Sequence, residues 1–296
     1  MKSIIIGAGT DLGVHINGSR YAPNQLIKDL KSVQKVKAVL LEQNKNIIKN
    51  RNISNRRKNE EEVNIFNNTL YQVIVEKEQE GFIPVVVGGD HSVSIASILA
   101  SSYVNQSVGL LYFSAHADFN TYETTPSGNI NGMTLATVLG YKQNELRIFH
   151  KANLVDHFKT CLIGTRSIDP RELDNINYVG INTFTTKDLQ TKDLKAIIDK
   201  AFEIASVKTK KIHVCFDLSI IDSAVATGVN IAEADGIDEK TMMKILDLVL
   251  DHLDNICCFD LVELNPLQDN KRKTEQIALN ILAKIYATIN TTLKKE

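Results

Sequence analysis

The strongest constraint on the fold is a repeated alternation between short apolar segments and longer segments with helical periodicity. The apolar segments are hydrophobic at nearly every position, and each ends in a polar or glycine-containing turn. Such strands, separated by helices, are typical of a parallel β-sheet that helices cover on both faces. We therefore predict an α/β fold, with strands near residues 3–6, 84–87, 108–113, 160–163, 211–216 and 255–262, and helices near residues 62–80, 92–102, 187–206, 239–253 and 274–291.

The bulk composition limits the classes of partner. The 296 residues are 43% hydrophobic and 23% charged, as expected for a globular protein with a sizeable core. The formal net charge of −1 gives no electrostatic reason to expect a nucleic-acid or membrane partner. No apolar run approaches membrane-spanning length, the N-terminal segment lacks the organisation of a signal peptide, and the cysteines form no CxxC pair. We expect buried free thiols and a cytoplasmic location.

Residues 43–62 are the least globular part of the sequence. The basic run at residues 56–58 could be taken for a binding motif, but the acidic run at residues 60–62 cancels its field. We therefore expect this stretch to be a solvated helix-loop segment. The sequence shows no internal repeat and no clear domain boundary.

Polar motifs follow five of the predicted strands at the point where each strand ends. Ligands of an open parallel sheet bind outside the carboxyl ends of its strands, so five polar turns at five such ends indicate a binding site rather than packing alone. The motifs are Gly88-Gly89-Asp90-His91-Ser92, Ser114-Ala115-His116-Ala117-Asp118, Gly164-Thr165-Arg166-Ser167, Asp217-Leu218-Ser219 and Glu263-Leu264-Asn265-Pro266.

His116 and Asp118 lie two residues apart on a strand extension, so an imidazole and a carboxylate can face the same point. Proteins bind hard or borderline metal ions with such donors. On these two residues alone, a metal-binding pair and a hydrogen-bonded pair are equally open. Ser114 continues the same alternation, and its neutral hydroxyl is a poor substitute for a carboxylate ligand.

Several of these residues also have purely structural interpretations. Asp90 and Ser92 can cap the helix that begins near Ser92, and we favour that role for both. His91 alone would be a satisfied buried histidine, and Asp169 precedes a proline, which is typical of a turn or helix start. Asp217 is harder to assign to packing, because it follows a strongly apolar run and an unpaired buried carboxylate is costly.

In their order along the chain, these motifs resemble those of the arginase and agmatinase (ureohydrolase) family, and the similarity extends over residues 4–291. Residues 116–132, with Ser-Gly-Asn, resemble arginase more closely than agmatinase. The resemblance implies a single three-layer α/β/α domain over residues 1–296, with a mostly parallel sheet, that usually forms trimers or hexamers. It also implies hydrolysis of a guanidino carbon–nitrogen bond, which in arginase converts arginine to ornithine and urea. The family uses two manganese ions and a bridging hydroxide.

Two positions that correspond to metal ligands of the family differ from its pattern. Ser114 and Ser219 stand where the family has aspartate, and the aspartate at the first position normally bridges the two ions. Asn131 is a further departure, because arginases carry there a histidine thought to shuttle protons. The segment 222–228 lacks the family's proline and is shorter. The positions that match the metal ligands are His91, His116, Asp118 and Asp217.

Charge arithmetic limits what such a site can hold. Asp118 and Asp217 balance one dication, whereas the four aspartates of the family balance two. With His91 they would hold the first ion, but His116 and a share of Asp217 are too few ligands for a second unless other groups contribute. We therefore expect at most one manganese ion. The loss of one ion, and of acid–base help typically worth about 10²–10⁴-fold, predicts weak or absent activity.

The positions that correspond to the substrate site of the family are better preserved. Glu263 matches the glutamate that pairs with the guanidinium, a geometry suited to bidentate hydrogen bonding. Asp169 matches a residue near the α-amino group of arginine. Asn120, Ser127 and Asn129 match residues that hold its α-carboxylate, although Ser127 to Asn129 could also be an ordinary turn.

Two hypotheses from different classes follow. In the first, the chain binds a small guanidino or amino-acid ligand without effective catalysis, as a homo-oligomer or in a hetero-oligomer with an active paralogue. In the second, it is a working hydrolase with a single metal ion, acting on arginine or on another guanidino or formimino substrate. The depleted set of metal ligands favours the first.

Overall fold

One β-sheet extends across the molecule. The computed structural model describes residues 2–49, 56–143, 153–209 and 211–292. Within these residues the sheet has eight strands, all parallel, in the order β2-β1-β3-β8-β7-β4-β5-β6. The predicted α/β class and parallel sheet are thus confirmed. The strands are β1 (Lys2–Gly9), β2 (Ala38–Glu42), β3 (Phe82–Gly88), β4 (Gly109–Phe113), β5 (Thr160–Thr165), β6 (Asn182–Thr185), β7 (Ile212–Asp217) and β8 (Ile256–Val262).

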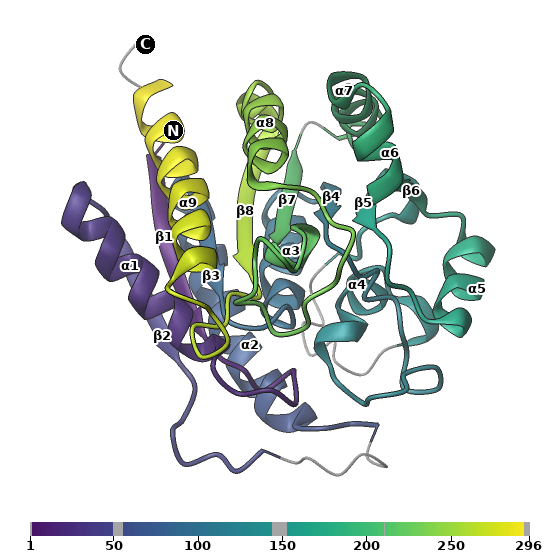
Figure 1. Cartoon of the computed structure of the whole chain (residues 1–296), viewed down its shortest axis with the longest axis horizontal. Coiled ribbons are helices and arrows are strands. Elements are labelled where there is room, and N and C mark those ends of the chain that lie inside the picture. Colours follow the sequence, from purple (N-terminus) through teal and green to yellow (C-terminus); the bar gives the residue numbers. More distant parts are fainter. Residues whose placement is uncertain (1, 50–55, 144–152, 210, 293–296) are drawn as a thin grey trace.

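Helices cover both faces of the sheet and make a three-layer α/β/α arrangement (Figure 1). One face packs against α1 (Ala22–Val33), α6 (Thr186–Thr191), α7 (Leu194–Ala205), α8 (Glu239–Leu250) and α9 (Lys273–Thr292). The other face packs against α2 (Glu60–Gln79), α3 (Val93–Val104), α4 (Thr134–Val138) and α5 (Pro170–Val179).

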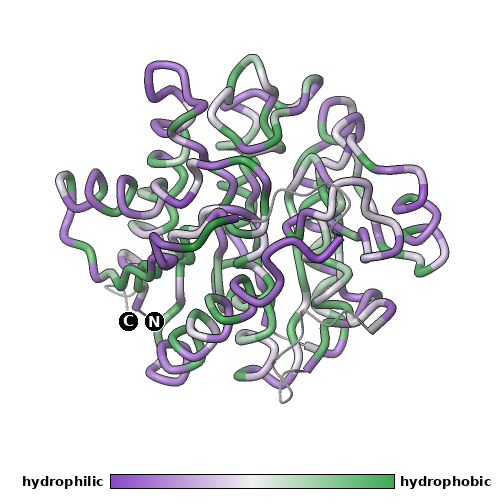
Figure 2. Tube along the Cα trace, turned by 90° about the horizontal axis from the view of Figure 1, so that it is seen from below, coloured by the Kyte–Doolittle hydropathy of each residue, from purple (hydrophilic) through white to green (hydrophobic). Residues whose placement is uncertain are grey.

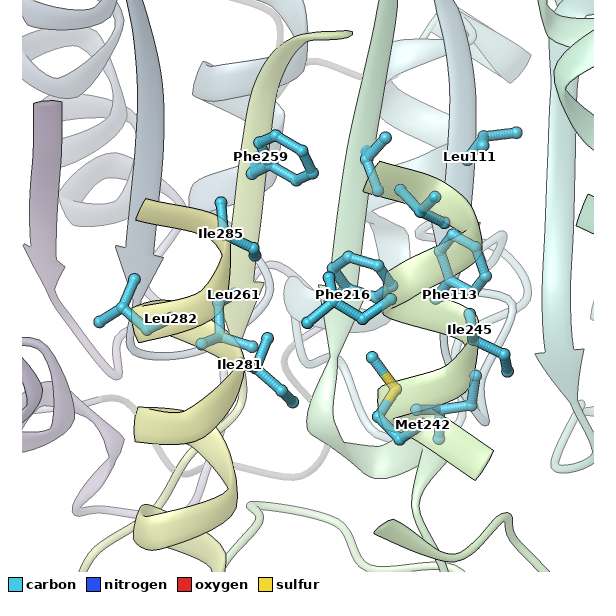
Figure 3. Packing of buried hydrophobic residues seen from close by; sticks show 14 of the residues in the cluster. Leu111, Phe113, Phe216, Met242, Ile245, Phe259, Leu261, Ile281, Leu282 and Ile285 are labelled. Atoms are coloured by element: carbon cyan, nitrogen blue, oxygen red, sulfur yellow. The ribbon is translucent and has the colours of Figure 1, made fainter. Parts of the chain in front are cut away.

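The two central strands, β7 and β8, are buried at every residue. Phe216 of β7 and Phe259 of β8 belong to one apolar cluster with Phe113 of β4, Met242 of α8 and Ile281 of α9 (Figure 3). The rings of Phe113 and Phe216 have centroids 4.7 Å apart. Full burial of such a side chain contributes about 1.5–3 kcal/mol. Figure 2 shows the same distribution, with hydrophobic segments inside and hydrophilic ones on the outer helices.

All of the predicted strands are present, and the two that the sequence missed, β2 and β6, are the edges of the sheet. Each edge strand mixes partly buried and exposed residues, so neither has the continuous apolar pattern of the buried strands. The helices α1, α4 and α5 were also missed. The predicted helix over 187–206 is two helices, α6 and α7, because Asp193 caps α7 through hydrogen bonds from the backbone N–H groups of Lys195 and Ala196.

The expected solvation of residues 43–62 is wrong for two of its lysines. The side chain of Lys49 is 6% exposed, and its Nζ lies 2.8 Å from Oδ1 of the buried Asp11. Lys58 is also buried, and its ammonium group donates a hydrogen bond to the backbone oxygen of Ser127. This segment therefore packs against loops at the carboxyl ends of the strands.

Neither Asp90 nor Ser92 makes the predicted side-chain cap of α3, whose N-cap residue is Ser92. Oδ1 of Asp90 accepts a hydrogen bond from the backbone N–H of Ser92 at 2.9 Å, directly before α3. The hydroxyl of Ser92 makes no capping hydrogen bond. Asp90 Oδ2 also accepts from the backbone N–H of Gly13, so this carboxylate joins two loops beside the sheet.

The four cysteines are buried free thiols, as predicted. Among the helices in the described ranges, none combines the length and the hydrophobicity that crossing a membrane would require.

Candidate metal and ligand site

A cavity of about 180 Å³ lies beyond the carboxyl ends of β3, β4, β5, β7 and β8, where the polar motifs meet. These loops gather at the lower end of the sheet in Figure 1. Ser114 is the one predicted site residue that does not line the cavity. Its hydroxyl donates a hydrogen bond to Asp217, which does line it. The predicted residues that do line it are His91, His116, Asp118, Asn120, Ser127, Asn129, Asn131, Asp169, Asp217, Ser219 and Glu263.

His91, Asp118 and Asp217 form the compact group of possible metal ligands at this cavity. Nδ1 of His91 lies 2.9 Å from Asp118 Oδ2 and 3.5 Å from Asp217 Oδ2. One ligand atom from each of the three lies within 4.8 Å of the other two, and all three side chains are buried. Asp118 has a φ of 51°, a left-handed conformation that aspartate tolerates better than most residues.

Tyr112, which the sequence analysis missed, contacts two members of this group. Its hydroxyl donates a hydrogen bond to Asp118 Oδ2 at 2.7 Å and lies 3.2 Å from His91 Nδ1. Its ring stacks on the imidazole of His91 with centroids 4.6 Å apart. The signal was available, because Tyr112 precedes Ser114 by two residues in the alternation that includes His116.

Ser114 and Ser219, which stand where the family resemblance implies aspartate, both donate hydrogen bonds to Asp217. The hydroxyls of Ser114 and Ser219 lie 2.8 and 2.6 Å from Asp217 Oδ2, and the backbone N–H of Ser219 lies 2.7 Å from Oδ1. Burial would raise the pKa of Asp217, but His91, His116 and these hydrogen bonds lower it to about 2. The carboxylate is therefore ionised and saturated with donors from the protein.

His116 pairs with Glu233, a residue that sequence analysis also missed. Nε2 of His116 lies 3.2 Å from Glu233 Oε1, which also accepts from the hydroxyl of Ser167 at 3.0 Å. Burial would lower the pKa of His116, but Glu233, Asp118 and Asp217 raise it to about 9. Glu233 lies in the loop between β7 and α8, outside the five motifs at the strand ends, so no motif pointed to it.

Glu263 is a buried carboxylate on the cavity wall, 4% exposed. Its Oε1 accepts from the backbone N–H of His91 at 2.6 Å and from Asn131 Nδ2 at 3.3 Å, and its Oε2 accepts from Asn230 Nδ2 at 2.7 Å. Burial, followed by repulsion from Asp217 and Asp90, raises its pKa to about 8. A cation placed against Glu263 would favour the ionised form.

The residues predicted to hold the polar end of a ligand also line the cavity. Asn120 Nδ2 donates to Asp169 Oδ2 at 2.9 Å, and Asn129 Nδ2 lies 2.9 Å from His15 Nδ1. The hydroxyl of Ser127 accepts from the backbone N–H of Asn129. The structure thus brings the predicted residues together and adds His15, which no sequence motif indicated.

The wall of this cavity is acidic. Among the lining residues that the structure describes, none is a lysine or arginine. Burial raises the pKa of one of the acids, Glu172, to about 7. At neutral pH the raised pKa values keep Glu263 largely protonated and His116 positively charged, so the net negative charge of the wall is smaller than its number of carboxyl groups suggests. The carboxylates on the wall are Asp118, Asp169, Glu172, Asp217, Glu233 and Glu263.

Known proteins with this sequence pattern and fold can be compared directly. Residues 1–287 match the sequence model of the arginase family. The chain belongs to the arginase family. The arginase of Brevibacillus brevis is 30% identical over 221 residues, which are 74% of this chain and 74% of that relative. The arginase of Staphylococcus aureus strain COL is 30% identical over 231 residues, 77% and 76% of the two chains.

Solved structures support the same fold. The arginase of Bacillus cereus superimposes with a TM-score of 0.85 at 26% identity, covering 97% of this chain and 98% of that one. An Entamoeba histolytica arginase in complex with L-ornithine has a TM-score of 0.87 at 24% identity, covering 96% and 98%. At that identity the second comparison supports the fold alone.

The donor atoms at the cavity fit one manganese ion better than two. Two carboxylates and one imidazole match the oxygen and nitrogen donors that a divalent manganese ion accepts, and their charges balance one dication. A second ion would need donors near Ser114 and Ser219, which offer neutral hydroxyls already directed at Asp217. His116 offers one further nitrogen, but its Nε2 faces Glu233.

Proposed function

We propose that this member of the arginase family binds a small guanidino or amino-acid ligand and hydrolyses it weakly or not at all. The observation that carries the proposal is the hydrogen bonding of Asp217 by Ser114 and Ser219. Two hydroxyls satisfy this carboxylate without supplying the positive charge of a second ion. The charge that would stabilise a developing transition state is therefore halved.

At most one manganese ion belongs to this proposal, held by His91, Asp118 and Asp217. When bound, the ion would supply Lewis-acid polarisation of the reacting centre. Asn131 occupies the position of the histidine that the family resemblance assigns to proton transfer. Its amide lies 3.3 Å from Glu263 Oε1 and cannot take up or release a proton at ordinary pH.

Ligand recognition is the better preserved half of the site. We assign the guanidinium or another cationic group to Glu263, a buried carboxylate with no lysine or arginine among the lining side chains that the structure describes. Asp169 would hold an α-amino group. Asn120, Ser127 and Asn129 would hold an α-carboxylate.

The metal content and turnover of the purified protein test this proposal together. We expect no more than one manganese ion per chain after loading, measured by elemental analysis, and urea release from arginine close to the uncatalysed blank. Arginine or ornithine should still give a binding isotherm by calorimetry. Two ions per chain with robust turnover of the unmodified protein would refute the proposal.

A reciprocal test restores the missing carboxylates. The double substitution Ser114→Asp with Ser219→Asp should raise the manganese content towards two ions per chain, because the site regains the charge of a second dication. The matched control Ser32→Asp, an exposed position on α1, should leave the metal content unchanged. If the double variant folds but gains no metal, the site has diverged beyond these two ligands.

A working hydrolase with a single metal ion is the second candidate function. The observation in its favour is the His91, Asp118 and Asp217 group, whose ligand atoms lie within 4.8 Å of one another. Under this alternative, one ion per chain would accompany measurable hydrolysis of arginine or of another guanidino or formimino compound. His91→Ala would then remove both the ion and the activity.

The assembly and location of the protein remain part of the proposal. We expect one domain over residues 1–296, because one sheet joins all the described strands. We also expect a trimer or hexamer of this chain, or a mixed oligomer with an active paralogue, in the cytoplasm. Size-exclusion chromatography with light scattering would show whether the purified chain alone forms a trimer or a hexamer.

A further inference from the structure

We propose a second, separate binding site for a divalent cation of zinc type between the central strands, formed by His213 of β7 with Cys258 and Asp260 of β8. One ligand atom from each residue lies within 4.8 Å of the other two, and all three side chains are completely buried. None of them lines the cavity described above. The site is therefore independent of the proposed function.

A β-bulge brings these residues together. The register between β7 and β8 pairs Ile212 with Ile256 and then His213 with Cys258, so Cys257 is an extra residue. Bulges are rare in parallel pairs and often re-aim a side chain. Here the bulge sets Cys258 opposite His213, while the thiol of Cys257 lies 3.4 Å from the backbone oxygen of Ile212.

The hydrogen bonds around His213 direct one ring nitrogen towards this point. Ser101 of α3 donates its hydroxyl proton to Glu78 at 2.5 Å, so its oxygen is free to accept from His213 Nδ1 at 3.1 Å. The proton of a neutral imidazole then resides on Nδ1, and Nε2 presents a lone pair. A ring nitrogen bonded to an outer partner in this way is typical of a histidine ligand.

Two buried atoms at this point lack hydrogen bonds. His213 Nε2 lies 3.1 Å from Asp260 Oδ2 without a well-aligned hydrogen bond, and Asp260 Oδ1 has no partner among the residues that the structure describes. Leaving a buried polar atom unsatisfied costs about 1–3 kcal/mol, more for a charged group. A cation bound between the carboxylate and the imidazole would satisfy both atoms.

The donor set matches zinc chemistry. One nitrogen, one sulfur and one carboxylate oxygen are common zinc ligands, and two donors at about 2.0–2.1 Å from a tetrahedral ion are roughly 3.3 Å apart. The His213–Asp260 separation of 3.1 Å is close to that value. A thiolate and a carboxylate balance the charge of one dication. Ser97 donates a hydrogen bond to Asp260 Oδ2 at 2.6 Å, which fixes the orientation of the carboxylate.

Such an ion would cross-link the two strands that carry the functional carboxylates. His213 precedes Asp217 on β7, and Asp260 precedes Glu263 at the end of β8. The expected role is structural, because all three ligands are buried and none of them lines the cavity. Burial raises the pKa of the Cys258 thiol well above its usual range, so the ion must displace the thiol proton when it binds.

Cobalt substitution tests this proposal in the full chain. Asp118→Asn protein, whose cavity site is weakened, is produced in cobalt-supplemented medium so that the ion can enter during folding. We expect one equivalent of cobalt and the near-ultraviolet charge-transfer absorption of a thiolate–cobalt bond. Cys258→Ser should lose both, whereas Cys257→Ser and Cys161→Ser should keep both. Cys258→Ala is the second variant in case the serine variant fails to fold.

The outcomes are decisive in both directions. Absence of cobalt and of the thiolate band from the folded protein would overturn the proposal and leave His213 and Asp260 as a simple buried ion pair. Persistence of the band in Cys258→Ser or Cys258→Ala would also overturn it, since another sulfur would then be the ligand.

Discussion

Glu263 is the carboxylate whose ionisation should be most visible in the stability of the protein. Burial, followed by repulsion from Asp217 and Asp90, raises its pKa from 4.5 to about 8. Between these two values the folded state keeps a proton that the unfolded state has lost. The stabilisation is therefore complete below pH 4.5 and is lost as the pH rises through about 8.

The size of this effect follows from the two pKa values. Their difference of about 3.5 corresponds to at most about 5 kcal/mol, since each pKa unit is worth about 1.36 kcal/mol. An assay that starts at about pH 5 covers about 3 of these pKa units, so we expect a change of up to about 4 kcal/mol. Glu263→Gln removes the ionisation and should flatten this part of the pH dependence. The amide nitrogen of the new glutamine would face the donor Asn230 Nδ2, and the resulting loss of a hydrogen bond destabilises the variant equally at every pH.

Urea unfolding followed by circular dichroism, from about pH 5 to 9, measures both profiles. The wild-type free energy of unfolding should fall relative to that of Glu263→Gln as the pH increases. Glu203→Gln is the control, because its carboxylate is 68% exposed, and its profile should follow that of the wild type. Parallel profiles for wild type and Glu263→Gln would refute the proposed burial cost of this carboxylate.

Three further predictions concern the loops around the cavity. Lys49→Met should cost about 1–3 kcal/mol in urea unfolding, because the buried Asp11 loses its ammonium partner at 2.8 Å and keeps only Arg20, 3.9 Å away; an unchanged midpoint would contradict this. Asp118→Asn should weaken manganese binding at least about tenfold by calorimetry while keeping the fold, since asparagine also tolerates a φ of 51°. Glu233→Gln should lower the pKa of His116 from about 9 in metal-free protein, as followed by NMR, and an unshifted titration would exclude Glu233 as the cause.

The sequence predicted the centre of the fold better than its edges. The buried strands β3, β4, β7 and β8 lie between two helical layers, so almost every residue is apolar and the pattern is unmistakable. β2 and β6 have one strand neighbour each, and their alternating exposure carries a weaker signal. The break between α6 and α7 depends on a capping aspartate inside an otherwise continuous helical pattern.

The candidate site was predicted to the extent that its residues follow strand ends. The sheet brings His91, Asp118, Asp217 and Glu263 to one cavity because parallel strands end on the same side. Glu233 approaches His116 from a long loop, whose path local sequence patterns do not define. Tyr112 was missed for another reason, because a tyrosine within an apolar strand is usually part of the core.

Under the proposed function, the two serine positions together would allow this site to exist without a second metal ion. A cluster of four aspartates without two dications would be destabilised by repulsion between buried charges. Serine at positions 114 and 219 removes two of those charges and supplies two donors to Asp217, which stays ionised with a pKa of about 2. Replacing one serine alone by aspartate should therefore destabilise the folded protein more than replacing both in the presence of manganese. A single added charge has neither a donor nor a second ion to balance it. Such non-additivity, measured as metal-dependent stability of the single and double variants, would distinguish a coordinated loss of the second ion from two unrelated substitutions.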